Sequence, residues 1–188
     1  MAAKALPAHD VLHQLLSYNP DTGKLFWKER DVDWFNATAT RTAEHAAKQW
    51  NSAHAGKSAF TARMPHGHFA GRILGTAFLA HRVIWKMVHG TEPTVIDHID
   101  GDGSNNRVSN LRSVTQLENN QNASRRTNNK TGVSGVYWSS PKSKWCACIR
   151  VKGHQTHVGY FKQFHEAVAA RKAAELEYGF HRNHGRAA

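Results

Sequence analysis

A polar stretch divides this chain into two parts. Residues 119–131 read N-N-Q-N-A-S-R-R-T-N-N-K-T and contain almost no apolar side chains. A segment of this composition cannot contribute to a hydrophobic core, so it predicts a linker, which we place at residues 123–132. In a chain of 188 residues, this leaves room for one small folded unit on each side.

The rest of the composition narrows the class of protein. Hydrophobic residues make up 40% of the chain and include six Trp and eight Phe, which is enough to build a core and argues against disorder. Apolar runs such as residues 73–79 are far shorter than the roughly 18 residues that span a bilayer, so no membrane partner is expected. The two cysteines, Cys146 and Cys148, do not suggest a disulfide framework. We therefore expect a protein of a reducing cytoplasm.

Charge is distributed unevenly along the sequence. Residues 1–90 hold 11 basic and 6 acidic side chains, residues 91–123 hold 2 and 5, and residues 124–188 hold 12 and 3. Basic segments gain affinity for a polyanion by displacing the counterions of its phosphates, which favours nucleic acid as the partner. The acidic island between them would repel that partner unless a divalent cation neutralises it. A soluble basic protein with one acidic loop is the alternative.

Hydrophobic spacing and turn residues predict the elements of the first part. We expect a small region of helices and strands over residues 1–80, followed by a helix that ends at Gly90. The expected helices are residues 7–17, 42–50 and 78–89; the expected strands are residues 24–28, 59–64 and 69–74, the last two forming a hairpin around residues 65–68, and residues 18–23 form a turn.

The acidic island reads as strand, loop, strand and helix. Residues 95–99 and 111–114 are the strands, and the Gly, Asp and Asn residues between them form the loop. Thr115 can cap the helix, with Glu118 completing a capping box. Asn119 then lies one turn inside the helix, on a face that could look back at Asp97.

These residue types suit phosphodiester hydrolysis. Asp97 offers a hard oxygen ligand, and Asn119 would add a second. Histidine, with a reference pKa of about 6.5, suits a general base near neutral pH, and His98 is adjacent. Few protein ligands leave positions for water and a phosphate oxygen, as Mg²⁺ prefers. A hydrated turn is the alternative, whereas an EF-hand fits poorly because Asn105 stands where its glycine is needed.

The motif V-I-D-H-I-D-G-D-x3-N-x3-N-L-R-x2-T-x3-N from Val95, preceded by H-R-V-I-W from His81, resembles the HNH nucleases of phage and intron-homing type. The segment Y-N-P-D-T-G-K-L-F-W from Tyr18 also looks like the leader of such phage proteins. The resemblance implies a ββα-metal (His-Me finger) core over residues 81–122 and metal-dependent cleavage of double-stranded DNA.

Carried over residue by residue, the resemblance makes His98 the general base and Asp97 a metal ligand. Asn110 becomes the central Asn that ties the loop together, and Asn119 the third motif residue and second ligand. Because many relatives have His where this chain has Asn119, Mg²⁺ or Mn²⁺ is favoured over a softer ion. The role of His81 is open, and packing is the simpler interpretation.

The second part resembles the Apetala/ethylene-response-factor type of DNA-binding domain over residues 133–179. The resemblance rests on G-V-Y-W-S-S-P-K-S-K-W-C-A-C-I-R-V from Gly135, H-V-G-Y-F from His157 and H-E-A-V-A-A from His165. It implies a three-stranded antiparallel sheet packed on one helix, which lays its sheet in the major groove. A basic tail, residues 180–188, follows.

Strand alternation assigns faces to this second sheet independently. Trp145, Ala147 and Ile149 should pack on the helix through its alanine stripe, Ala167, Ala170 and Ala174. Cys146 falls on the opposite face with the predicted DNA-binding residues Tyr137, Ser139, Lys144, Cys148, Arg150 and His157. A sheet used for protein contacts is one alternative. A zinc site of Cys146, Cys148, His154 and His157 is another, although its spacing is unusual.

These observations predict an α+β protein that acts as a metal-dependent DNA endonuclease, with no small-molecule cofactor and a C-terminal sheet that binds DNA. Its main rival is a catalytically inactive DNA-binding regulator; a structural virion protein would leave the acidic island unexplained. The sequence leaves the target site, the type of cut and the oligomeric state open.

Overall fold

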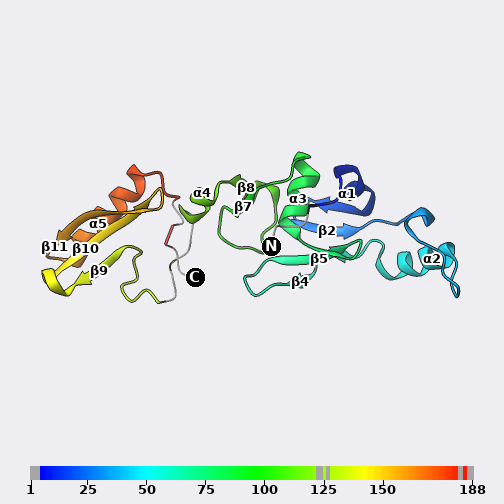
Figure 1. The fold of residues 1–188 in the computed structure, drawn as a ribbon, viewed down its shortest axis with the longest axis horizontal. Helices are drawn as coiled ribbons and strands as arrows, with labels where there is room; N and C mark the ends of the chain where they lie inside the picture. Colours follow the sequence, from blue (N-terminus) through cyan, green and yellow to red (C-terminus); the bar gives the residue numbers. More distant parts are fainter. Residues whose placement is uncertain (1–4, 122–124, 126–127, 182–183, 186–188) are drawn as a thin grey trace. The chain divides into compact units, whose positions relative to one another are not determined.

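The computed structural model describes residues 5–121, 125, 128–181, 184 and 185. The chain forms two compact units, which are described separately (Figure 1). Unit 1 comprises Met1–His98 and Asp102–Ser113, and unit 2 comprises Ile99–Gly101 and Val114–Ala188. Part of the predicted linker, residues 123–132, and part of the predicted basic tail, residues 180–188, lie outside the described residues.

Unit 1 begins with a helix and a small antiparallel sheet. Helix α1, His9–Leu15, leads into β1, Leu16–Asn19, which pairs with β2, Lys24–Trp27, and β2 pairs with β3, Ser58–Ala59. The β1–β2 turn is fixed by Asn19, whose Oδ1 accepts from the N–H groups of Asp21 and Thr22, each at 3.0 Å. A short 3-10 helix, Val32–Trp34, and α2, Ala43–His54, fill the connection to β3.

A second sheet of unit 1 supports the helix that precedes the acidic island. Strands β4, Ala62–Arg63, β5, Phe69–Ile73, and β6, Thr76–Leu79, pair antiparallel in chain order. Helix α3, Ala80–His89, follows and ends at Gly90, whose φ of 72° allows a left-handed cap. The core gathers α1, α3 and both sheets around fully buried aliphatic side chains: Leu12, Leu15, Leu16, Leu25, Ile73, Val83 and Ile84.

The acidic island has the predicted order of elements. Strand β7, Val95–His98, pairs with β8, Leu111–Val114, and a 3-10 turn, Val108–Asn110, lies directly before β8. Helix α4, Gln116–Gln121, belongs to unit 2 and has the predicted capping box. The Thr115 Oγ1 accepts from the Glu118 N–H at 3.3 Å, and a Glu118 carboxylate oxygen accepts from the Thr115 N–H at 2.7 Å.

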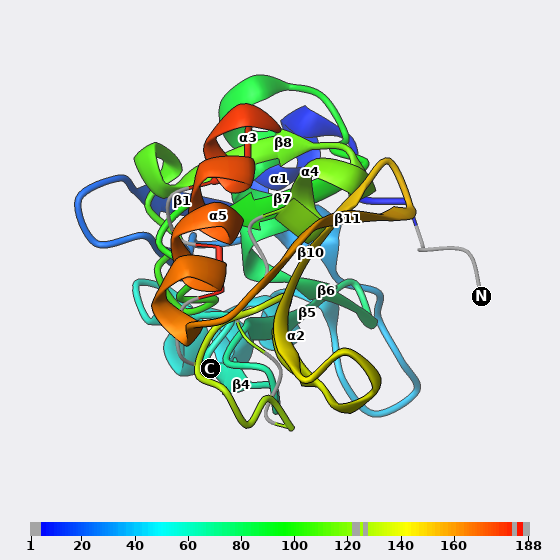
Figure 2. The same cartoon turned by 90° about the vertical axis from the view of Figure 1, so that its left-hand side faces the viewer.

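Unit 2 has the predicted three-stranded antiparallel sheet with one helix on it (Figure 2). Strand β10, Lys144–Val151, lies between β9, Val136–Ser139, and β11, His154–Phe161; a 3-10 turn, Ser140–Lys142, joins β9 to β10. Helix α5, Phe164–Glu177, buries Ala167 against Val136 and Ala147, so the alanine stripe packs on the sheet as expected. Ala174 is also buried, and Ala170 is half-buried.

Several predicted boundaries are wrong for identifiable reasons. The first helix ends at Leu15 because Leu16 is needed in the core, where it is 1% exposed and pairs with Trp27. Residues 59–64 are divided between two sheets, since Phe60 has a φ of 56° and turns the chain between β3 and β4. The helix expected from residue 78 begins at Ala80, because Thr76–Leu79 pairs with β5.

Cys146 also differs from expectation. It lies on the sheet face opposite α5, as alternation requires, but it is 1% exposed and cannot present its side chain to a partner. Its cross-strand neighbours are Tyr137 and Tyr160, and its Sγ lies 3.6 Å from the Nδ1 of His157. Large side chains on the neighbouring strands therefore cover the thiol.

Gly135 is a position where the fold of unit 2 requires glycine. Its φ is +76°, and a Cβ there would collide with the carbonyl oxygen of Cys148 and lie 2.6 Å from the Nε of Arg171. Arg171 is itself 3% exposed and donates from Nε to the Ser134 carbonyl at 3.0 Å. The close approach of β9 to both groups therefore depends on the missing side chain.

We predict that Gly135→Ala destabilises unit 2 more than Gly153→Ala. Both glycines have positive φ, so both substitutions should carry a backbone strain of about 1–2 kcal/mol, but a Cβ at Gly153 meets no described atom within 4 Å. The collision at Gly135 should add about 1–3 kcal/mol. Chemical denaturation followed by tryptophan fluorescence gives the free energy of unfolding of both variants. Equal destabilisation would show that the structure relieves the collision at Gly135 at no cost in stability.

Candidate active site and sheet surface

His98 ends strand β7, and a hydrogen bond to a loop side chain orients its ring. Its imidazole is 5% exposed, and its Nε2 lies 3.0 Å from the Oδ1 of Asn106, a residue that is 2% exposed. An amide oxygen only accepts, so Nε2 carries the hydrogen and donates. In the neutral ring the lone pair is then on Nδ1, which is the nitrogen that can take up a proton or bind a metal.

The loop that carries Asn106 is fixed by the turn between β1 and β2. The hydroxyl of Tyr18 donates to the Asn106 carbonyl at 3.1 Å and accepts from the Val108 N–H at 2.8 Å. The Nε of Arg107 donates to the Asp21 carbonyl at 2.6 Å. A Cβ at Gly23 would lie 2.7 Å from backbone atoms of Asn106 and Arg107, so only glycine permits this approach.

Asn110 lies where the central Asn of the motif was expected. It is 9% exposed, and its Nδ2 donates to the carbonyl of Asn105 at 2.9 Å. This bond closes the end of the loop next to Asn106. The contact is of the kind that the predicted loop-tying role requires, while its contribution to any reaction stays a prediction.

Asp97 contacts a different group from its neighbour His98. Its carboxylate is buried, and its Oδ2 accepts from Nε and Nη2 of Arg112 on β8, at 2.9 and 2.7 Å. Arg112 therefore neutralises a carboxylate that the sequence analysis expected a divalent metal ion to neutralise. Asn119 lies on α4, in unit 2, and the structure does not test its predicted pairing with Asp97.

Three histidines of unit 1, one of them His98, lie close together. His68 comes from the turn directly before β5, His81 from α3 and His98 from β7, and one ring nitrogen of each lies within 4.8 Å of the others. Burial and then the neighbouring imidazoles His98 and His68 lower the pKa of His81 to about 3. Burial, followed by His98, also lowers the pKa of His68. These two rings are therefore neutral at physiological pH, and the cluster could hold a metal ion.

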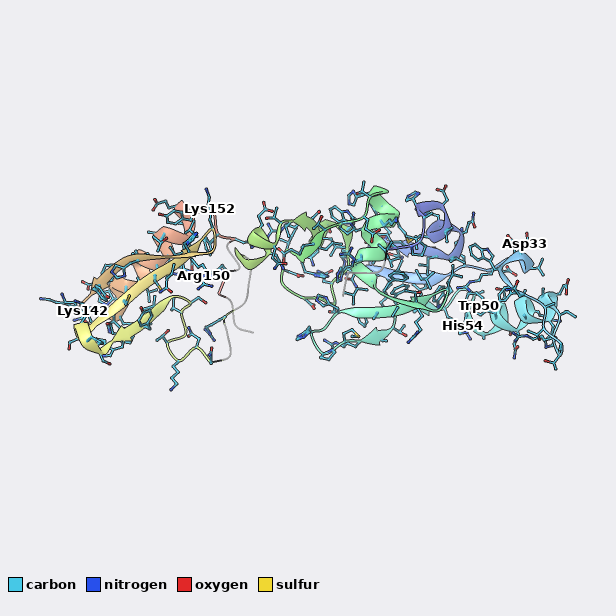
Figure 3. All side chains as sticks on the ribbon, viewed as in Figure 1. Asp33, Trp50, His54, Lys142, Arg150 and Lys152 are labelled. Atoms are coloured by element: carbon cyan, nitrogen blue, oxygen red, sulfur yellow. The ribbon has the colours of Figure 1, made fainter. Side chains whose placement is uncertain are left out.

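The predicted DNA-binding residues share one face of the unit 2 sheet, as the strand register shows. Cys148 pairs with His157, Lys144 with Ser139, and Arg150 with Gln155, while Tyr137 lies opposite Cys146. Figure 3 labels Arg150 on this sheet, with Lys142 and Lys152 at opposite ends of β10. Tyr160, which the sequence analysis did not select, is on the same face and is 43% exposed.

The alternative zinc site in unit 2 is not formed. Among the described residues, the only group of three or more His, Cys, Asp or Glu with ligand atoms close together is the histidine cluster of unit 1. His154 pairs with Val151 at the far end of β11, whereas Cys146 pairs with Tyr160. Burial, and then Cys146, raise the pKa of the Cys148 thiol, which disfavours the thiolate that zinc would require.

Sequence reasoning assigned no role to four residues of the site: Tyr18, His68, Asn106 and Arg112. Tyr18 was placed only in the leader-like segment, and Asn106 and Arg112 stand in the quoted HNH-like motif without an assigned role. His68 lies about 30 residues before His98 in the chain, so only the tertiary fold brings the two together.

Comparison with known proteins gives an independent view of this region. Residues 78–121 match the model of the HNH endonuclease family. The chain is also 32% identical over 77 residues to Protein 3.8 of Escherichia phage T7, and the match spans 40% of this chain and 64% of that protein. No solved structure matches the chain.

The comparisons agree with the predicted HNH segment and with a relationship to phage proteins. They give no evidence for an Apetala/ethylene-response-factor domain or for a homing function. In the part of the chain that the structure describes, no helix has the length and apolar content needed to cross a membrane.

We predict that Tyr18→Phe loosens the loop that carries Asn106. The variant keeps the ring but loses the hydroxyl that joins Asn106 and Val108, which should lower the free energy of unfolding by about 1–3 kcal/mol. Amide hydrogen exchange at Val108 should accelerate. Tyr160→Phe, at an exposed ring in unit 2, is the control and should leave both quantities nearly unchanged. If the amide of Val108 exchanges at the same rate in Tyr18→Phe as in the wild type, the Tyr18 hydroxyl does not hold the loop in place.

Proposed function

We propose that this protein is a metal-dependent DNA endonuclease that hydrolyses phosphodiester bonds. The observation that carries the proposal is the His98–Asn106 hydrogen bond, which sets the tautomer of an imidazole next to Asp97 within the segment that matches the HNH endonuclease family. Incubating the protein with plasmid DNA and Mg²⁺, with and without a chelator, tests it directly.

His98 acts as the general base in this proposal. Because Nε2 donates to Asn106, the lone pair of Nδ1 accepts the proton of the attacking water. Asn106 also orients the resulting imidazolium, whose Nε2–H still needs an acceptor. Tyr18 and Gly23 act through Asn106 and are positioning residues, since they contact its backbone and have no contact with the reacting atoms in this scheme.

A hard divalent cation, Mg²⁺ or Mn²⁺, fits the donor chemistry of Asp97, which would hold it together with Asn119. If bound there, such an ion would supply positive charge to the phosphate and to the departing oxygen. Binding requires the Asp97 carboxylate to share or release Arg112, whose side chain is 32% exposed and can turn toward a phosphate instead. The ion pair keeps the buried carboxylate neutralised before the substrate arrives.

DNA binding is assigned to the open face of the unit 2 sheet. Tyr137, Ser139, Lys144, Cys148, Arg150 and His157 lie on the side opposite α5, and the segment from residue 124 carries 12 basic against 3 acidic residues. A short sheet can enter the major groove of duplex DNA, where arginine pairs with guanine. We also propose that the DNA-binding domain spans residues 133–179.

The rival function is a DNA-binding regulator that does not cut. Burial of His98 and the ion pair of Asp97 with Arg112 favour it, since burial restricts access of DNA to the His98 ring and Arg112 already neutralises the Asp97 carboxylate. Chelator-sensitive cleavage of plasmid would exclude this rival. Binding of the same DNA without cleavage under any divalent cation would establish it.

We predict that His98→Ala lowers the cleavage rate by about 10²- to 10⁴-fold, the usual contribution of a general base. Affinity for DNA should stay within about twofold, because phosphate contacts supply most of it. His66→Ala is the matched control, because His66 is an exposed histidine in the hairpin that also carries His68. Cleavage by His98→Ala at the wild-type rate would remove His98 from the mechanism.

We predict that Arg150→Ala weakens DNA binding by about 1–3 kcal/mol if Arg150 contacts a base. Lys162→Ala removes the same charge from the turn that leads into α5, and should weaken binding less. Fluorescence anisotropy at several salt concentrations separates the two effects, because loss of a phosphate contact lowers the salt slope by about one and loss of a base contact does not. If both substitutions weaken DNA binding by the same small amount, the sheet does not read DNA bases and has another partner.

A further inference from the structure

The histidine cluster of unit 1 has properties that the proposed hydrolysis does not use. His68 lies in the turn before β5, His81 on α3 and His98 on β7, and their ring centroids are 4.9 to 5.4 Å apart. Ring nitrogens of all three lie within 4.8 Å of one another. His81 and His98 are buried, at 6% and 5% exposure, and His68 is half-buried.

Two of the three rings are held as metal-binding histidines are held. The Nε2 of His98 donates to the side-chain oxygen of Asn106, and the Nδ1 of His68 donates to the carbonyl oxygen of Gly103 at 3.3 Å. Histidine ligands usually donate from the second ring nitrogen to such an oxygen, which fixes the tautomer and orients the ring. A Cβ at Gly103 would lie 2.6 Å from the His68 Nδ1, so glycine permits this close contact.

The third ring has a buried nitrogen without a partner. The Nδ1 of His81 is inaccessible to solvent and makes no hydrogen bond. Burying a polar atom without a hydrogen-bond partner costs about 1–3 kcal/mol of free energy. Binding of a ligand to that atom would offset this cost. Binding of a cation by the His81 imidazole would give this buried ring a polar partner.

We propose that His68, His81 and His98 form a binding site for one transition-metal ion of the zinc class. Imidazole suits Zn²⁺, Co²⁺ and Ni²⁺ better than Mg²⁺, so this site differs in ligand chemistry from the oxygen site proposed at Asp97 and Asn119. Tetrahedral zinc with Zn–N distances of about 2.0–2.1 Å needs its ligand atoms roughly 3.3 Å apart. Because the three ligand atoms lie within 4.8 Å of one another, the side chains would have to move closer together when the ion binds.

Three imidazoles leave a fourth coordination position for water or an anion. The effect of such an ion on DNA cleavage rests on the proposed function. If His98 is the general base, an ion bound to its lone pair prevents it from accepting a proton, so zinc should inhibit Mg²⁺-dependent cleavage. The site would then make cleavage depend on the supply of a second metal.

Titration of the full-length, metal-free protein with Co²⁺ tests the site without relying on activity. We expect visible absorption bands of tetrahedral Co²⁺ that saturate at one ion per chain and disappear when Zn²⁺ is added. His68→Ala and His81→Asn should weaken binding at least about tenfold, because each removes one of three ligands. His66→Ala should bind as the wild type does.

His68→Ala is the decisive variant because the half-buried hairpin position can lose its ring with little effect on packing; circular dichroism checks its fold. Absence of stoichiometric binding, or equal affinity in His68→Ala, His66→Ala and the wild type, would overturn the site. A cleavage assay in Mg²⁺ with added Zn²⁺ is a separate measurement. Zinc binding without inhibition supports the site and contradicts the role of His98 as general base.

Discussion

The hydrogen bond from His98 Nε2 to Asn106 Oδ1, at 3.0 Å, is the contact on which the proposed site depends. It joins the end of β7 to the loop before β8 and decides which ring nitrogen keeps a lone pair. The remaining contacts hold this pair in place. Tyr18 and Gly23 fix the backbone of Asn106 from one side, and Asn110 closes the loop from the other. The β1–β2 turn is thus a structural part of the site, although it lies about 80 residues earlier in the chain.

Two uses of the same lone pair follow from this arrangement. A general base must accept a proton from water, whereas a zinc ligand must give its lone pair to the ion. His98 cannot do both at once, and the neighbouring His68 and His81 favour the second use when zinc is present. Asp97, the proposed oxygen ligand, is paired with Arg112 on β8. The two proposed metal sites are therefore separable by ion type and by substitution.

Local patterns predicted what local interactions determine. The capping box of Thr115 and Glu118, the β4–β5 hairpin and the faces of the unit 2 sheet each depend on residues a few positions apart, and each agrees with the structure. His68 meets His98, and Tyr18 meets the Asn106 backbone, across about 30 to 90 residues of chain, for which the sequence has no periodic signal. Burial of Cys146 was missed because alternation assigns a face but not the size of the side chains that cover it. Asn119 and the DNA-binding role of the sheet stay predictions.

The tautomer of His98 tests the account most directly. Long-range ¹H–¹⁵N correlation spectra of the metal-free protein at neutral pH distinguish a protonated ring nitrogen from one that carries a lone pair. The hydrogen bond to Asn106 predicts that Nε2 of His98 is protonated and Nδ1 is not. In Asn106→Leu this preference should be lost. A wild-type ring with its proton on Nδ1 would contradict the account, because neither the general base nor the zinc ligand would then have the lone pair that each requires.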